Sequence, residues 1–174
     1  MTEEQQKELM KELAGDLAEL GEDVHFGQDE RSKLYVIQAS LPITEDRKYY
    51  LSAQVVLFPL FQEDMGLEVI YYLTGDIEKK AMEEVKKAVN ELNYISPTGP
   101  FGVREDSGKL YMRFCTRIDK NKDADGQEED ALIDMNIAMA TVQSGYIGLR
   151  EVWEGKITFD EAVEKDMLRK SAVG

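Results

Sequence analysis

The stretch from Tyr49 to Leu73 constrains the fold more than any other part of the chain, because its odd-numbered positions are repeatedly apolar. A period of two is typical of β-strands, whose successive side chains point to opposite faces of a sheet. The pattern predicts strands over Tyr49–Leu60 and Leu67–Leu73, joined by a polar, glycine-containing hairpin loop at residues 62–66. The core-facing set would be Tyr49, Leu51, Ala53, Val55, Leu57, Leu67, Val69, Tyr71 and Leu73.

The opposite face of this hairpin also carries large apolar residues, namely Val56, Phe58, Ile70 and Tyr72. A fully solvated sheet face would be more polar, so something should cover them. Two alternatives remain open from the sequence: a helix of the same chain, or a second subunit. Pro59 cannot donate a ladder hydrogen bond, which predicts that the first strand ends there or reaches an edge.

Two further segments complete the expected N-terminal half. Thr2 to Gln5 has the pattern of a capping box, and the leucines that follow at spacings of three and four predict an amphipathic helix that stops at Gly21. A strand is expected over residues 34–41, before the hairpin, so that three strands form a meander. The connection after Gly21 could itself begin with a strand at residues 24–26. The leucines of the helical stripe are Leu9, Leu13, Leu17 and Leu20.

The C-terminal half alternates helices with a second hairpin. Asp76 is expected to cap a helix that ends near Asn93, and residues 101–105 and 109–118 are expected to be strands around a glycine turn at Gly108. A long helix should start at residues 128–130, and a second capping box at Thr158 should open a final helix reaching about Leu168.

Strands and helices in blocks indicate an α+β fold with an antiparallel sheet. The expected element order is α-β-β-β-α-β-β-α, in a single domain over residues 1–174 with a C-terminal helical extension at about 156–174. We find no internal repeat and no linker long enough to divide the chain.

The charge and the cysteine content of the chain limit the classes of partner and the compartment that we expect. The formal net charge is -14, and the lysines stand among glutamates, so a nucleic-acid backbone is not an expected partner. The single Cys115 cannot form an internal disulfide, which suits a reducing compartment. We expect a soluble cytoplasmic protein without membrane contact, because no signal-like segment opens the sequence and no apolar run could span a bilayer.

The order of elements resembles the type III secretion chaperone-like fold and, within it, the bacterial YbjN-like family of unknown function. The resemblance covers about Leu9 to Trp153. It rests on the Tyr49–Leu73 hairpin, the helix ending at Leu92-Asn93, and three later features: Pro97-Thr98-Gly99-Pro100-Phe101-Gly102-Val103, the turn Ser107-Gly108-Lys109-Leu110, and the strand that contains Arg113. The family implies a dimeric or partner-binding domain without a known catalytic constellation. The acidic loop at 119–130 and the helix after Gly155 lie outside this pattern.

The acidic loop at residues 119–130 resembles a calcium-binding loop in part. Oxygen-bearing side chains alternate at Asp119, Asn121, Asp123 and Asp125, as they do in an EF-hand loop. If the loop starts at Asp119, its sixth residue is alanine rather than glycine. If it starts at Asn121, its twelfth residue is a leucine, which cannot bind a metal. The competing interpretation is a solvated loop that caps the following helix.

His25 and Cys115 are the only histidine and cysteine, and a nucleophilic pair would require them to touch. No phosphate-binding loop, dinucleotide fingerprint, metal-ligand spacing or nucleophile elbow is present. We therefore expect that the protein is not an enzyme and that it binds no cofactor.

The expected function is that of a non-enzymatic protein-binding module of chaperone-like or regulatory type. It would form a homodimer and hold a protein or peptide client through Val56, Phe58, Ile70 and Tyr72. The alternative is a calcium- or ligand-responsive regulatory protein that uses the acidic loop 119–130.

Overall fold

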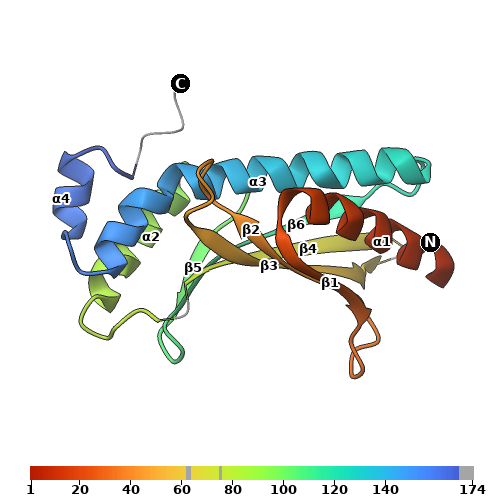
Figure 1. Cartoon of the computed structure of the whole chain (residues 1–174), viewed down its shortest axis with the longest axis horizontal. Helices are drawn as coiled ribbons and strands as arrows, with labels where there is room; N and C mark the ends of the chain where they lie inside the picture. Colours follow the sequence, from red (N-terminus) through yellow and green to blue (C-terminus); the bar gives the residue numbers. More distant parts are fainter. Residues whose placement is uncertain (62–63, 75, 169–174) are drawn as a thin grey trace. The chain divides into compact units, whose positions relative to one another are not determined.

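A computed structural model describes residues 1–61, 64–74 and 76–168 (Figure 1). The strands form one six-stranded sheet in the order β1-β2-β3-β4-β6-β5, and the pairs β1–β2, β2–β3 and β5–β6 are antiparallel. The expected α+β class with an antiparallel sheet is confirmed. The elements are α1 (Glu3–Leu20), β1 (Glu22–Gln28), β2 (Tyr35–Pro42), β3 (Tyr50–Pro59), β4 (Met65–Thr74), α2 (Met82–Ile95), β5 (Phe101–Arg104), β6 (Lys109–Ile118), α3 (Ala124–Trp153) and α4 (Phe159–Glu164).

Contacts divide the chain into two compact units. The first unit comprises Met1–Tyr71 and Phe114–Asn136, and the second comprises Tyr72–Arg113 and Ile137–Gly174. The strands β4 and β6 and the helix α3 each begin in one unit and end in the other.

The first unit has a one-sided core, as the period of two predicts. Strands β2 and β3 pair in continuous register from Tyr35 opposite Leu57 to Pro42 opposite Tyr50. Every second residue of these strands is buried, and α1 and the first turns of α3 lie on that side of the sheet (Figure 1). The fully buried side chains of the unit include Leu13, Ile37, Val55, Leu67 and Val69.

The helix α1 starts and stops where the sequence predicts. The Gln5 backbone N–H donates to the Thr2 hydroxyl over 3.2 Å, and the Thr2 N–H donates to the Gln5 side-chain carbonyl over 2.8 Å. At the other end, a Cβ on Gly21 would stand 2.5 Å from the Ser40 carbonyl oxygen, so the helix can end against β2 only with glycine there. The predicted leucine stripe is too long by one residue, because Leu20 is 50% exposed.

The predicted element order is wrong by one strand, because the structure has four strands between α1 and α2. The additional strand is β1, at the sheet edge, which extends the possible strand at residues 24–26. Within β1 only Val24 and Phe26 are partly buried, and Phe26 stacks on Tyr35 with ring centroids 5.9 Å apart. An edge strand buries little, so its alternation is weak in the sequence.

In the second unit, α2 starts later than predicted. The expected cap at Asp76 is wrong: α2 begins at Met82, and Ala81 precedes it without a side-chain cap. The Ile77 N–H donates to the Gly108 carbonyl over 3.1 Å, which ties residues 76–81 to the β5–β6 turn before the helix can begin. Gly75 lies outside the described residues, as do Gln62 and Glu63 of the predicted hairpin loop.

The hairpin β5–β6 is held to the end of α2 by one asparagine. The Asn93 side chain accepts a hydrogen bond from the Phe101 N–H over 2.6 Å and donates one to the Phe101 carbonyl over 2.9 Å. The turn places Gly108 at φ 62°, which confirms the expected positive φ.

The long helix α3 begins four residues earlier than predicted, at Ala124, and its two internal glycines permit close packing in the second unit. A Cβ on Gly145 would stand 3.0 Å from the Leu92 side chain, and a Cβ on Gly148 would stand 2.5 Å from the Met167 carbonyl oxygen. The capping box at Thr158 is confirmed, but α4 ends at Glu164 rather than near Leu168. Residues 169–174 of the expected C-terminal extension lie outside the described part.

Within residues 1–61, 64–74 and 76–168, no helix combines the length and the apolar character that a membrane crossing requires.

Candidate functional site

The sheet of the first unit has one face that its helices leave uncovered. Residues of β1 to β4 that alternate with the core residues point to this side, and they are exposed or partly exposed. In the first unit as described, α1 and the start of α3 both lie on the other side (Figure 1). We call this side the open face and define it by His25, Val36, Gln38, Gln54, Val56, Phe58 and Ile70.

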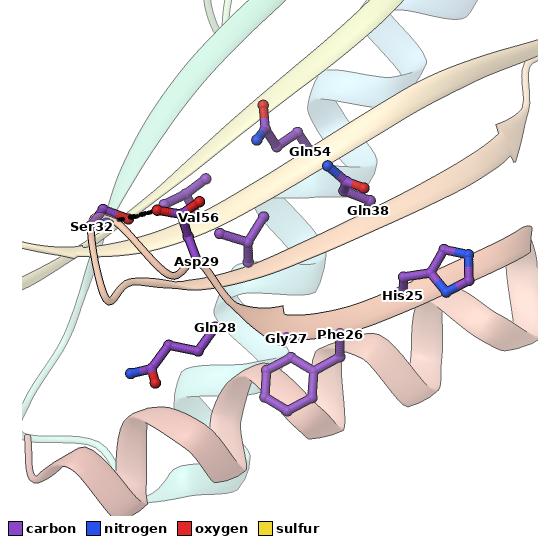
Figure 2. A pocket seen from close by; sticks show the side chains of 10 residues that line it. His25, Phe26, Gly27, Gln28, Asp29, Ser32, Gln38, Gln54 and Val56 are labelled. Atoms are coloured by element: carbon purple, nitrogen blue, oxygen red, sulfur yellow. Dashed lines mark hydrogen bonds between the residues drawn. The ribbon is translucent and has the colours of Figure 1, made fainter.

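A shallow hollow of about 390 Å³ lies on the open face, across β1, β2 and β3. Figure 2 shows His25, Gln38, Gln54 and Val56, which line the hollow together with Val36. The register places Gln38 opposite Gln54 and Val36 opposite Val56. The floor thus combines a pair of amides, which can donate and accept hydrogen bonds, with a pair of branched apolar side chains.

The turn between β1 and β2 forms a rim of the hollow. The Asp29 carboxylate accepts hydrogen bonds from the Ser32 N–H and the Ser32 hydroxyl, each over 2.7 Å, and from the Arg31 N–H over 3.2 Å. The two bonds from Ser32 lower the pKa of Asp29, and they outweigh the opposing effect of desolvation. Asp29 therefore stays ionised and engaged with its own turn, which gives the rim a defined shape (Figure 2).

The four residues expected at a partner surface fall into two groups. Val56, Phe58 and Ile70 lie on the open face of the first unit and are partly exposed. Tyr72 belongs to the second unit, where its ring lies 6.4 Å from the Tyr111 ring and 5.4 Å from the Lys109 ammonium nitrogen. The Phe58 ring covers Gly66, where a Cβ would come within 2.8 Å of it. This packing explains why Phe58 is not fully exposed.

The polar members of the open face, which are His25, Gln38 and Gln54, were not predicted to lie on a binding surface. A usable signal existed for two of them, because Gln38 and Gln54 occupy alternate positions between core residues of β2 and β3. No such signal marked His25, since its strand was not securely predicted.

The second unit has its own apolar hollow, of about 510 Å³, between the end of α2, the segment before β5 and the middle of α3. Its lining includes Ile95, Pro97, Ile137 and Ala140. Three large apolar side chains among the described residues of this unit are strongly exposed, with Tyr94 at 89%, Ile137 at 46% and Ile147 at 45%. Neither unit therefore buries all of its apolar surface.

Cys115 and His25 are not brought together. Cys115 lies on β6 and His25 on β1, with β2, β3 and β4 between them. Four strand spacings amount to about 19 Å, too far for proton transfer between the side chains. Cys115 is exposed, and its sulfur lies 3.8 Å from a Glu68 carboxylate oxygen. Arg117, on the same strand, pairs with Asp64 over 2.7 Å.

In the acidic loop, two carboxylates accept hydrogen bonds from backbone N–H groups of the loop itself. The Asp119 carboxylate accepts from the Asn121 N–H over 2.9 Å, and the Asp123 carboxylate accepts from the Gly126 N–H over 3.0 Å. Lys122 pairs with Asp130 over 2.6 Å. Asp125 is exposed in the first turn of α3. In the part of the chain that the structure describes, no three His, Cys, Asp or Glu side chains are grouped so that they could hold a metal ion.

Calcium binding provides a direct test of this loop. We expect isothermal titration of the protein with CaCl₂ to show no binding stronger than millimolar, because Asp119 and Asp123 would have to give up backbone hydrogen bonds to bind the ion. Micromolar binding that disappears in Asp123→Ala but persists in the matched variant Asp134→Ala would contradict this expectation and support the calcium-responsive alternative.

Comparison with known proteins adds no relative: neither a family model, nor a curated protein, nor a solved structure matches the chain.

Proposed function

We propose that this chain is a non-enzymatic protein-binding module of chaperone-like or regulatory type, related in organisation to the type III secretion chaperone-like fold and the YbjN-like family. It associates as a homodimer and binds a protein or peptide client. The observation that carries the proposal is the open face, where Val56, Phe58 and Ile70 remain partly exposed beside the hollow.

The composition of the open face supports protein binding. Apolar side chains supply the free energy of association, at roughly 25 cal/mol per Å² removed from water, and the neighbouring amides of Gln38 and Gln54 can bond to a peptide backbone. A self-complementary patch is most simply covered by a second copy of the same chain, since a symmetric pair closes on itself. The shallow form of the hollow suits an extended segment better than a small molecule.

Two charges placed on this face should abolish association. We expect the wild-type protein to sediment as a dimer at micromolar concentration, and Phe58→Glu/Ile70→Glu to sediment as a monomer. Each substitution removes apolar contact area and would bury an unpaired carboxylate in the interface. Sedimentation velocity at several protein concentrations, with circular dichroism to confirm folding, measures this.

The control is Lys7→Glu/Lys11→Glu, which places two carboxylates on exposed positions of α1, on the other side of the sheet from the open face. It should remain a dimer. A monomeric wild-type protein would refute the dimer. A folded double variant that still dimerises would move the interface elsewhere, with Tyr94 and Ile137 as the next residues to change.

The same variants separate client binding from dimerisation. Peptides selected from a displayed library on the wild-type protein should lose binding to Phe58→Glu/Ile70→Glu and keep it on the control variant. Selected peptides that bind all three proteins equally would argue against the open face as the client surface.

A further inference from the structure

The part of α3 that belongs to the second unit carries no charged side chain over residues 137–149, although 32% of the whole chain consists of Asp, Glu, Lys and Arg. Some of this stretch is nevertheless on the surface. The side chains of Ile137 and Ile147 are 46% and 45% exposed, and Ala140 and Gln143 are exposed as well. The solvated side of a helix ordinarily carries charged residues. An uncharged side with exposed isoleucines is typical of a surface that packs against a further helix.

The exposed apolar positions have the spacing of a helix-pairing surface. Ile137, Ala140, Ser144 and Ile147 follow one another at intervals of three, four and three residues, as the contact positions of a coiled coil do. We call these four residues the α3 seam. The other side of the helix packs within the unit, where residues such as Val142 are fully buried. Helix α3 is therefore apolar on two sides, and its own unit fully buries only one of them.

The polar groups of the seam are bonded within the helix. The Ser144 hydroxyl donates to the Thr141 carbonyl over 2.6 Å, and the neighbouring Thr141 hydroxyl donates to the Ile137 carbonyl over 3.0 Å. A hydroxyl whose hydrogen is already bonded in this way can be covered without losing that hydrogen bond. Ile137, Ala140 and Ser144 also line the hollow of the second unit, so the seam borders a recess that can receive a side chain.

We propose that the α3 seam pairs with the α3 seam of a second copy of this chain, antiparallel and about a twofold axis level with Val142. The spacing is symmetric about that residue, since Ile137 and Ile147 lie five positions to either side of it, and Ala140 and Ser144 lie two positions to either side. Ile137 of each copy then meets Ile147 of the other, and Ala140 meets Ser144. Small side chains at the centre let the helices approach closely, and the isoleucines fill the space at both ends.

The charges of α3 favour the antiparallel direction over the parallel one. Arg150 follows the seam and pairs with Glu154 over 2.7 Å. A parallel pair would bring the acidic starts of both helices together. An antiparallel pair separates them and sets Arg150 level with Asp134 of the second copy, because these residues lie eight positions to either side of Val142. The charged residues of α3 before the seam are all acidic: Asp125, Glu128, Glu129, Asp130 and Asp134.

This surface is separate from the open face and goes beyond the function proposed above. The seam lies in the second unit, whereas the open face lies in the first. A chain with two self-complementary surfaces assembles past the dimer. About three helical turns bury less than the roughly 1,200 Å² of a stable interface, so pairing through the seam is weak and requires protein at about 0.1–1 mM.

Sedimentation equilibrium at about 0.5 mM protein tests the seam in a variant that lacks the open-face dimer. We expect Phe58→Glu/Ile70→Glu, which is monomeric at micromolar concentration, to dimerise there, and the wild-type protein to pass from dimer to larger species. Adding Ile137→Glu/Ile147→Glu should abolish both effects, because each new carboxylate would be buried without a partner. Both isoleucines are exposed, so the fold should tolerate these changes, which circular dichroism checks.

The matched control is Asn90→Glu/Tyr94→Glu, which adds the same charge at two exposed positions of α2 and should leave the association unchanged. Association that survives Ile137→Glu/Ile147→Glu, or that the control also abolishes, would overturn the seam. A Phe58→Glu/Ile70→Glu variant that stays monomeric at every concentration would overturn it too, and would leave a helix of another protein as the occupant. If Ile137→Glu/Ile147→Glu alone makes a micromolar wild-type dimer monomeric, the seam stands and the open-face dimer fails.

Disulfide trapping in a Cys115→Ser background tests the antiparallel register. Ala140→Cys mixed with Ser144→Cys should give a crosslinked heterodimer, identified by its intact mass, because the two positions face each other. Neither variant alone should crosslink, since an offset of four residues and the distance between the helix axes separate the two cysteines by about 10 Å. Efficient crosslinking of Ala140→Cys by itself would indicate a parallel pair and overturn the proposed one.

Discussion

Replacing Leu13 by alanine should lower the free energy of unfolding by about 3 kcal/mol, since the substitution deletes three carbon atoms from the centre of the first unit's core. Leu13 is fully buried, and α1 places it against β1 and β2 beside Leu9 and Leu17. Strand β2 is held in continuous register by β3 and cannot collapse into the cavity, so the cavity cost adds to the lost burial. Urea unfolding followed by circular dichroism measures the change.

Leu20→Ala provides the control, because it makes the same chemical change on the same helix at a side chain that is 50% exposed. It should cost about 0.5 kcal/mol or less. Similar losses for the two variants would show that α1 does not pack as described.

Replacing Gly148 by alanine should also cost about 3 kcal/mol, because the new methyl group has no room. Its Cβ would stand 2.5 Å from the Met167 carbonyl oxygen and 2.9 Å from the Leu168 side chain, and the nearest of these atoms belongs to the backbone. Backbone cannot rotate away, so α3 and the segment after α4 must separate, exposing the buried Leu168. The higher helix propensity of alanine recovers only about 1 kcal/mol.

The control for this substitution is Gly15→Ala in α1. Gly15 is exposed, and its Cβ would meet nothing within 4 Å, so the variant should gain roughly 0.5–1 kcal/mol in stability. Thermal unfolding of both variants should therefore shift in opposite directions. A stabilised Gly148→Ala would mean that α3 does not approach residues 167–168 this closely.

Short-range patterns identified much of the fold correctly. The period of two in β3 and β4 assigned Leu51, Val55 and Leu67 to the core, and the capping boxes at Thr2 and Thr158 marked two helix starts. Each pattern depends on residues a few positions apart. Alternation shows which side of a strand is buried, and a capping box shows where a free backbone N–H finds an acceptor, so both can be recognised from neighbouring residues.

The predictions that were wrong required contacts between distant segments. Asp76 has the chemistry of a helix cap, but a hydrogen bond from Ile77 to Gly108 delays α2. The edge strand β1 escapes detection because few of its side chains are buried, and it exists through its pairing with β2.

The candidate site, too, was predictable from the sequence in part, and the rest of it depends on tertiary packing. The apolar content of Val56, Phe58 and Ile70 is legible in the sequence, because it depends on alternation within two adjacent strands. Which side the helices cover is decided in three dimensions, by where α1 and α3 pack, and so is the hollow that brings His25 beside Gln38.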